Sequence, residues 1–253
     1  MKKEVINNIL CISAMASEVK PLVKEYSPKT SKVKRGKVIE VSCNDKNIYF
    51  FITGVGRKNV LKNLKTIEHI LDKVDIVVLV GVCGAIDERY KMGDVVIPEA
   101  ITKRAGNEIL IKNLDLLPWK DIKISKSVHK GVRLLTDDSF VTQEEKKDIR
   151  KKQYEISAVD MESFYGVSFF VEKQKPIYVI KSVSDRFNSP LPRESFLIEH
   201  YSKKSFIGML KNFILHPQET YKLLLLLKNI KYAIKINTRY VKELLDRLLG
   251  VQT

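Results

Sequence analysis

Short apolar runs alternate with amphipathic segments along most of the chain. Compact runs rich in Val, Ile and Phe predict β-strands, whereas apolar positions that recur every three or four residues predict helices. We expect strands over residues 8–14, 37–43, 47–56, 74–86, 93–100, 157–160 and 176–185. We expect helices over residues 17–26, 57–74, 142–152 and 161–173, and mainly loops over residues 102–127.

The run VDIVVLVGVCGAI at residues 74–86 is apolar without alternation. Continuous apolar strands are typical of the middle of a parallel sheet, where helices cover both faces. Strands that alternate with helices along a chain also favour a parallel arrangement. The predicted fold is therefore α/β, with a mainly parallel or mixed central sheet flanked by helices.

The pattern changes near residue 202, after which only helical periodicity is found. Segments 203–215, 216–229 and 231–249 are basic and amphipathic, and Pro217 suits a first helical turn. We therefore divide the chain into an α/β domain at residues 1–201 and a basic helical extension at residues 202–253. We expect the core to be complete without this extension, and the pocket residues all to precede Arg186.

The extension carries ten Lys or Arg residues against three acids. Lys222 and Lys228 bracket its five consecutive leucines, so no run has the length that a membrane span needs. Such a helix can lie at an anionic membrane surface, or pack on the core or on a second subunit. We expect burial for Leu223–Leu227 and peripheral membrane contact for the extension as a whole.

The N-terminal stretch raises the question of a secretory signal, because two lysines precede an apolar run and an Ala-Met-Ala triplet. Glu4 interrupts the positive start, and the run from Ile9 to Ala16 is short for a signal core. We therefore expect a strand and then a helix, with Ser17 as a candidate N-cap. The three cysteines lie in or beside strand-like runs and are interpreted as reduced thiols of a cytoplasmic protein.

The formal net charge of +15 fits an anionic partner such as nucleic acid, an acidic substrate or a membrane surface. Charge alone supports a nucleic-acid-binding module, and we expect none, because no aromatic-and-basic strand motif is found. A dinucleotide-binding dehydrogenase is a further alternative, since GVGRKN begins a helix after a strand. Asn59, however, stands where that fingerprint needs its third glycine.

Acidic residues and glycines gather where the predicted strands end. Glu18 follows the first strand, GVCGA ends the central one, and VDMES and SVSD follow two later ones. Each feature alone fits a turn or a helix cap. Because α/β proteins place ligands at the carboxyl ends of their strands, the features together predict an active site.

Five motifs, in this order, resemble those of the purine nucleoside phosphorylase and nucleosidase superfamily. AMASEV is similar to the first-loop motif of methylthioadenosine and S-adenosylhomocysteine nucleosidases. In that motif Ala-Met is followed by acidic residues, and the last of these acids aligns with Glu18. TGVG resembles the family's Ser-Gly-Ile-Gly turn, and GVCGAIDERYKMGDVVIPEA resembles its glycine-rich strand end. AVDMES resembles Val-Glu-Met-Glu, and IKSVSDRF resembles the strand that ends in Ser-Asp. The resemblance covers about residues 8–190.

The resemblance implies a role for each matching residue. Cleavage of an N-glycosidic bond is helped by protonation of the leaving base and by carboxylates near the developing positive charge. Asp185 would be the general acid toward the purine, and Glu18 would orient and deprotonate the attacking water. Glu162 and Met161 would contact the ribose, and Phe140 would stack on the base. The remaining candidates for substrate binding are Val82, Cys83, Gly84 and Ser184.

Water and phosphate are alternative nucleophiles for this chemistry. Val82 stands where the family commonly has serine, so a hydroxyl that could touch phosphate is lost. A carboxylate at Glu18 would also repel an anion, and both features favour water. Arg57 and Gly56 are the candidates for phosphate contact, although Arg57 also fits a solvated charge at a helix start. We expect no metal and no cofactor, with inorganic phosphate retained as an alternative co-substrate.

Finer details resemble the hopanoid-associated phosphorylases. These details are the VDMES form of the motif, the continuation SDRFNSPLP, and a basic tail containing HPQETYKLLLLL. The implied substrate is a purine nucleoside, either a small molecule or linked to a lipid as in adenosylhopane, from which adenine is removed. The superfamily also implies a homo-oligomer.

Overall fold

The computed structural model describes residues 6–26, 38–43, 45–104, 106–111, 122, 126–153, 155–193, 195–196 and 215–250. Its strands are β1 (Asn8–Ser13), β2 (Ile39–Cys43), β3 (Lys46–Ile52), β4 (Ile76–Ala85), β5 (Val95–Lys103), β6 (Glu108–Leu110), β7 (Val128–Thr136), β8 (Ile156–Asp160) and β9 (Ile177–Asp185). Its helices are α1 (Ala16–Tyr26), α2 (Arg57–Leu64), the 3-10 helix η1 (Lys65–Lys73), α3 (Gln143–Lys152), α4 (Ser163–Glu172) and α7 (Pro217–Leu249).

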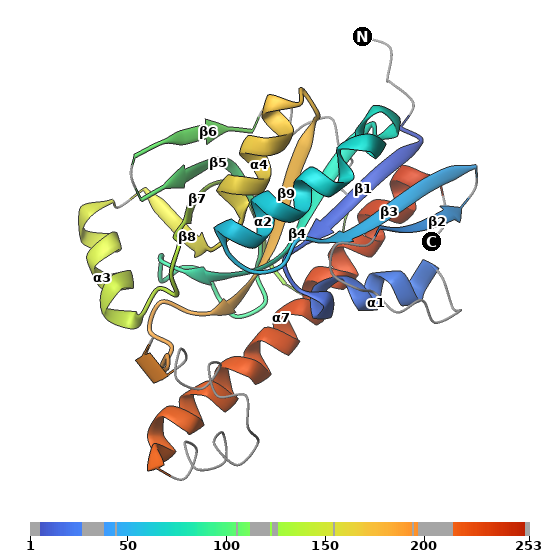
Figure 1. The fold of residues 1–253 in the computed structure, drawn as a ribbon. Coiled ribbons are helices and arrows are strands. Elements are labelled where there is room, and N and C mark those ends of the chain that lie inside the picture. The colour runs from blue at the N-terminus through green and yellow to red at the C-terminus, as the bar shows by residue number, and fades with distance from the viewer. Residues whose placement is uncertain are drawn as a thin grey trace.

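The strands form one mixed sheet that closes on itself at one end (Figure 1). Strands β3, β1, β4 and β9 are parallel neighbours, and β2 lies antiparallel to β3 at the edge. Beyond β4, the pairings β4–β8, β8–β7, β7–β5, β5–β9 and β9–β4 complete a ring. The predicted α/β class, with a mixed central sheet flanked by helices, is confirmed.

Helices cover both faces of the parallel part of the sheet. Alternate residues of β1 face opposite layers: Leu10 and Ile12 pack with α2, η1 and α4, whereas Ile9 and Cys11 pack with α1 and α7. Every residue of β4 except Val82 is buried, which confirms the central strand expected from its continuous apolar run.

Several predicted boundaries differ from the structure. Strand β7 was not predicted, because Lys130, Gly131 and Arg133 break its apolar pattern, yet it pairs with β5 and β8. Strand β6 falls in the expected loop region, of which residues 112–121 and 123–125 lie outside the described part. The single helix expected over 57–74 divides into α2 and η1. Helix α1 begins at Ala16, so Ser17 lies inside the helix and the expected N-cap is wrong.

The C-terminal segments 216–229 and 231–249 form one helix, α7, which begins at Pro217 and ends at Gly250 in the left-handed conformation. Its second half packs on β4, β9 and α1, where Tyr240, Val241 and Leu244 are fully buried. The expectation that the core is complete without the extension is therefore wrong. Of the expected helix at 203–215, residues 203–214 lie outside the described residues, as does the domain boundary near 201, which stays a prediction. None of the helices in the described part of the chain has the length and apolarity needed to cross a bilayer.

Candidate active site

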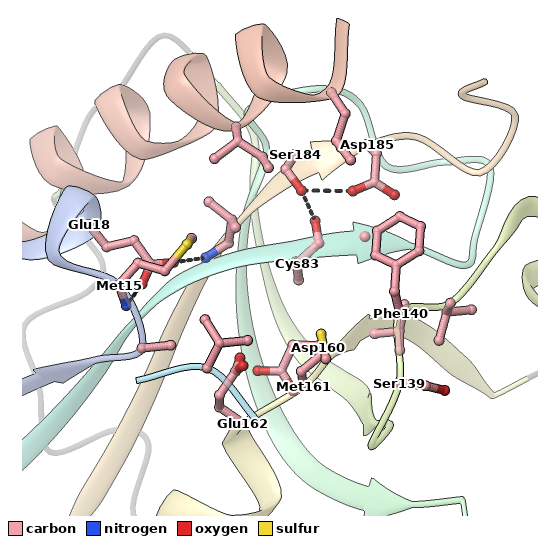
Figure 2. Close-up of a pocket in the computed structure, with 18 of the residues that line it drawn as sticks. Met15, Glu18, Cys83, Ser139, Phe140, Asp160, Met161, Glu162, Ser184 and Asp185 are labelled. Carbon is pink, nitrogen blue, oxygen red and sulfur yellow. Dashed lines mark hydrogen bonds between the residues drawn. The ribbon is translucent and has the colours of Figure 1, made fainter. Parts of the chain in front are cut away.

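A cavity of about 510 Å³ lies at the carboxyl ends of β1, β4, β8 and β9, with α7 passing over it (Figure 2). Four acidic residues line it, and the three treated first below are Glu18, Glu162 and Asp185, with Asp160 as the fourth. They come from segments far apart in the sequence, and the pairing of β4 with β1, β8 and β9 brings the four strand ends together. The predicted convergence of the strand-end motifs is found in the structure.

Glu18 is fixed in the first turn of α1 by two backbone donors. Its Oε2 accepts the N–H of Met15 at 2.9 Å, and its Oε1 accepts the N–H of Val82 at 3.2 Å. The side chain is 5% exposed, and burial raises the pKa of Glu18 above its usual range, against the opposing effect of Lys181 and the two hydrogen bonds. A carboxylate with a raised pKa is suited to accept a proton near neutral pH.

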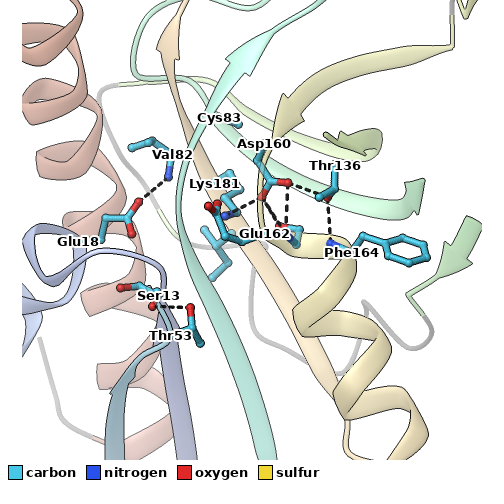
Figure 3. A network of polar contacts seen from close by, with 12 residues as sticks. Ser13, Glu18, Thr53, Val82, Cys83, Thr136, Asp160, Glu162, Phe164 and Lys181 are labelled. Atoms are coloured by element: carbon cyan, nitrogen blue, oxygen red, sulfur yellow. Dashed lines mark hydrogen bonds and ion pairs between the residues drawn. The ribbon is translucent and has the colours of Figure 1, made fainter. Parts of the chain in front are cut away.

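A buried cation lies behind the cavity, between the carboxylates (Figure 3). Lys181 Nζ is 2.9 Å from Asp160 Oδ2, and both side chains are at most 2% exposed. Thr136 Oγ1 donates to Asp160 Oδ1 at 2.8 Å, and the N–H of Ser163 also donates to this carboxylate. Desolvation lowers the pKa of Lys181, but Asp160, Glu162 and Glu18 outweigh it and raise that pKa, so Lys181 is charged.

Glu162 stands at the N-cap position of α4, where its side chain makes no capping hydrogen bond and faces the cavity instead. Its Oε1 accepts the N–H of Gly56 at 3.0 Å. Burial, helped by the charge of Asp160, raises the pKa of Glu162 to about 7, although Lys181 opposes the shift. Glu162 therefore changes charge within the pH range in which most enzymes work.

Asp185 ends β9 and is held by two side chains. Ser184 Oγ lies 2.7 Å from Asp185 Oδ1 and 3.1 Å from the carbonyl oxygen of Cys83. Lys146 Nζ forms a short ion pair with Asp185 Oδ2 and also donates to the carbonyl oxygen of Arg186 at 3.3 Å. A Cβ at Gly84 would lie 2.7 Å from Asp185 Oδ2, so the glycine makes room for the pair.

The rest of the cavity wall is largely apolar. Phe140 and Met161 line the side next to Asp185 and Glu162. Helix α7 contributes the residues of its inner side, which are Leu223, Leu226, Leu227 and Ile230. The expectation that all pocket residues precede Arg186 is therefore wrong.

Arg57 and Gly56, the two candidates for phosphate contact, are not among the residues that line the cavity, whereas Val82 is. The guanidinium carbon of Arg57 lies 5.6 Å from the ring centre of Tyr165. The N–H of Val82 already donates to Glu18, so it is not open to an anion. Lys146 is the one basic side chain among the described residues that line the cavity, and it is paired with Asp185.

A family model described as the phosphorylase superfamily matches residues 8–203. The chain belongs to this superfamily. A DeoD-type purine nucleoside phosphorylase from Colwellia psychrerythraea is 29% identical over 130 residues, which are 46% of this chain and 54% of that protein. The chain thus spans about half the length of that relative.

Solved structures of the superfamily share the fold at low identity. The 5′-methylthioadenosine/S-adenosylhomocysteine nucleosidase of Neisseria meningitidis, solved with methylthio-immucillin-A, is 18% identical with a TM-score of 0.70, over 96% of this chain and 100% of that chain. The S-adenosylhomocysteine nucleosidase of Streptococcus pyogenes is 16% identical with a TM-score of 0.70, over 96% of this chain and 98% of that chain. The futalosine hydrolase of Helicobacter pylori is 15% identical with a TM-score of 0.68, over 96% of this chain and 98% of that chain. These similarities support the same fold for this superfamily member.

Sequence reasoning missed two lysines and the wall formed by α7. Lys181 carried a usable signal, since a lysine inside the apolar run of β9 must find a charged partner when buried. Lys146 carried almost none, because it is one of several basic residues in the polar helix α3. Only its spacing of three from the buried Ile149 marks the inner side of that helix.

Taken together, the cavity has two chemically different ends. Asp185 and Phe140 lie at one end, where a flat base could stack beside a carboxyl group. Glu18 and Glu162 lie at the other end, where two carboxylates could stabilise a cationic sugar and accept protons. The inner side of α7 forms an apolar wall of the cavity, on which a hydrophobic substituent could pack.

Proposed function

We propose that the chain hydrolyses the N-glycosidic bond of a purine nucleoside and releases the base. The observation that carries the proposal is the convergence of Glu18, Glu162 and Asp185 on one cavity, with Phe140 beside Asp185. Membership of the phosphorylase superfamily supports it, because relatives and structural neighbours include a purine nucleoside phosphorylase and nucleosidases.

In this mechanism Asp185 gives a proton to a ring nitrogen of the purine as the glycosidic bond breaks. The bonding electrons leave with the base, and the sugar develops positive charge that Glu162 and Glu18 stabilise. Glu18 takes a proton from water as the water oxygen bonds to the anomeric carbon. Because the ion pair leaves Asp185 without a proton of its own, the proton it delivers is the one it shares with Lys146, which passes through the Asp185 carboxyl group to the base.

Water is favoured over phosphate as the nucleophile by the charges around the cavity. The one basic side chain in the described lining is already paired, and Glu18 would repel an anion. Arg57, the candidate for phosphate contact, is directed to Tyr165 instead. The test is to incubate the enzyme with a purine nucleoside at low and high phosphate and to identify the sugar product. Free sugar at both concentrations supports hydrolysis, whereas a sugar 1-phosphate as the main product overturns it.

The apolar inner side of α7 supports a substrate whose 5′ substituent is hydrophobic. Adenine is the proposed base. Among nucleosides with a hydrophobic 5′ substituent, a lipid-linked one such as adenosylhopane is the candidate with the largest substituent. Leu226→Asn should raise KM for a 5′-alkylthioadenosine by about tenfold and leave KM for adenosine nearly unchanged, since burying an amide without partners costs about 1–3 kcal/mol. The matched control is Leu224→Asn on the exposed side of α7, where Leu224 is 57% exposed. Equal effects of both variants would argue against an apolar subsite on α7.

A further inference from the structure

The outward side of α7 combines large apolar side chains with basic ones. Tyr221, Leu224, Leu227 and Tyr232 are 66%, 57%, 39% and 40% exposed. Lys228, Lys231, Lys235 and Arg239 are exposed on the same stretch at helical spacing. We call these eight residues the outer face of α7. Soluble proteins rarely expose so many large apolar side chains together without a binding role.

The outer face carries an excess of positive charge. No acid occurs between Glu219 and Glu243, whereas this interval holds six basic residues. Lys222 pairs with Glu219, and Lys242 pairs with Asp246. The other four basic residues are those of the outer face, and they form no ion pair with any residue in the described part of the chain.

The outer face adjoins the active-site cavity. Leu223, Leu226 and Ile230 line the cavity from the inner side of α7. Leu227 belongs to both, because it lines the cavity and is also 39% exposed. Figure 1 shows that the start of α7 extends beyond the sheet.

We propose that the outer face of α7 docks on an anionic lipid surface. Exposed leucine side chains and tyrosine rings, interspersed with basic residues, are the combination that binds the headgroup region of a bilayer. A second copy of the chain is disfavoured, because a two-fold contact through this face would bring its four cations against four others. Nucleic acid is disfavoured because phosphate contacts need no exposed leucines. On the proposed function, this docking would place the cavity beside a lipid-linked substrate.

The test is sedimentation of the full-length protein with vesicles of phosphatidylcholine alone and with phosphatidylserine added, at low and high salt. Each cation near an acidic surface changes partitioning roughly fivefold, so removing four should lower it by two to three orders of magnitude. The test variant carries Lys228→Gln, Lys231→Gln, Lys235→Gln and Arg239→Gln. The matched control removes the same charge from the opposite layer, at exposed positions, with Lys58→Gln, Lys62→Gln, Lys65→Gln and Lys73→Gln.

We expect the wild type and the control to bind the anionic vesicles at low salt and to be released at high salt. The test variant should lose this binding. Equal loss in both variants would mean that net charge alone acts, and would overturn the proposal. So would tighter binding of duplex DNA that displaces the vesicles, or a dimer that only the test variant converts to monomer. Hydrolysis of a soluble nucleoside, measured in parallel, reports on the proposed function independently of the vesicle result.

Discussion

Replacement of Lys181 by methionine should shift the acid limb of the pH–rate profile to higher pH. Lys181 is the buried cation that faces Asp160, Glu162 and Glu18. It opposes the effect of burial on Glu18, whose pKa is already raised. Without it, Glu18 would hold its proton to a higher pH and would be unable to accept one from water.

The size of the shift can be worked from the glycine at the centre of this group. A Cβ built on Gly81 would lie 2.9 Å from Glu18 Oε1 and 3.1 Å from Lys181 Nζ. The two atoms are therefore roughly 6 Å apart at most, which gives an attraction of ~3 kcal/mol at an effective dielectric constant of about 20. At 1.36 kcal/mol per unit, this corresponds to a shift of roughly two pH units.

The assay is kcat/KM for base release across the pH range, for wild type, Lys181→Met and Lys181→Arg. Circular dichroism should first show that each variant is folded, because removing one partner of a buried ion pair typically costs about 3–5 kcal/mol. Lys181→Arg keeps the charge and should keep the wild-type limb where it folds. A folded Lys181→Met enzyme whose acid limb is unchanged, or lies at lower pH, would refute the role given to this cation.

Three further predictions concern Asp185, its partner Lys146, and Glu162. Asp185→Asn should lower kcat by about a hundredfold to ten-thousandfold with the fold intact, since the amide keeps the shape and loses the acid; an unchanged rate would remove Asp185 from the mechanism. Lys146→Met should slow base release, but the double variant with Asp185→Asn should be no slower than Asp185→Asn alone, because the two residues act as a unit; additive losses would contradict the pairing. Glu162 holds its proton more tightly in the folded chain, so its contribution to stability is lost as pH rises from 4.5 to about 7. Glu162→Gln should therefore raise the free energy of unfolding by about 1–3 kcal/mol above neutral pH and change it little in acid, and a gain confined to acid pH would show that the sign is wrong.

The sequence predicted those parts of the fold in which local pattern and tertiary environment agree. The continuous apolar run of β4 can be buried only between two helical layers, and the structure places it there. Strand β7 was missed because Lys130, Gly131 and Arg133 break its apolar pattern. The strand forms nevertheless because it pairs with β5 on one side and β8 on the other, and local propensity carries no information about such pairing.

The candidate site was partly predictable for a similar reason. Motifs next to strand ends carry a local signal, and Glu18, Glu162 and Asp185 all lie in such motifs. Lys146 and Leu226 lie on helices far along the chain, and only the packing of those helices directs their side chains to the cavity. Amphipathic spacing shows that each helix has an inner side but not what that side meets.

The most direct test of hydrolysis at this site is to follow the fate of the solvent oxygen. Purified full-length enzyme is incubated with a 5′-alkylthioadenosine in isotopically labelled water, with phosphate present, and the products are examined by chromatography and mass spectrometry. The account predicts free adenine together with a free sugar that has gained one labelled oxygen atom, and almost no base release from Glu18→Gln. Intact nucleoside with the wild-type enzyme, or a sugar phosphate without the label, would contradict it.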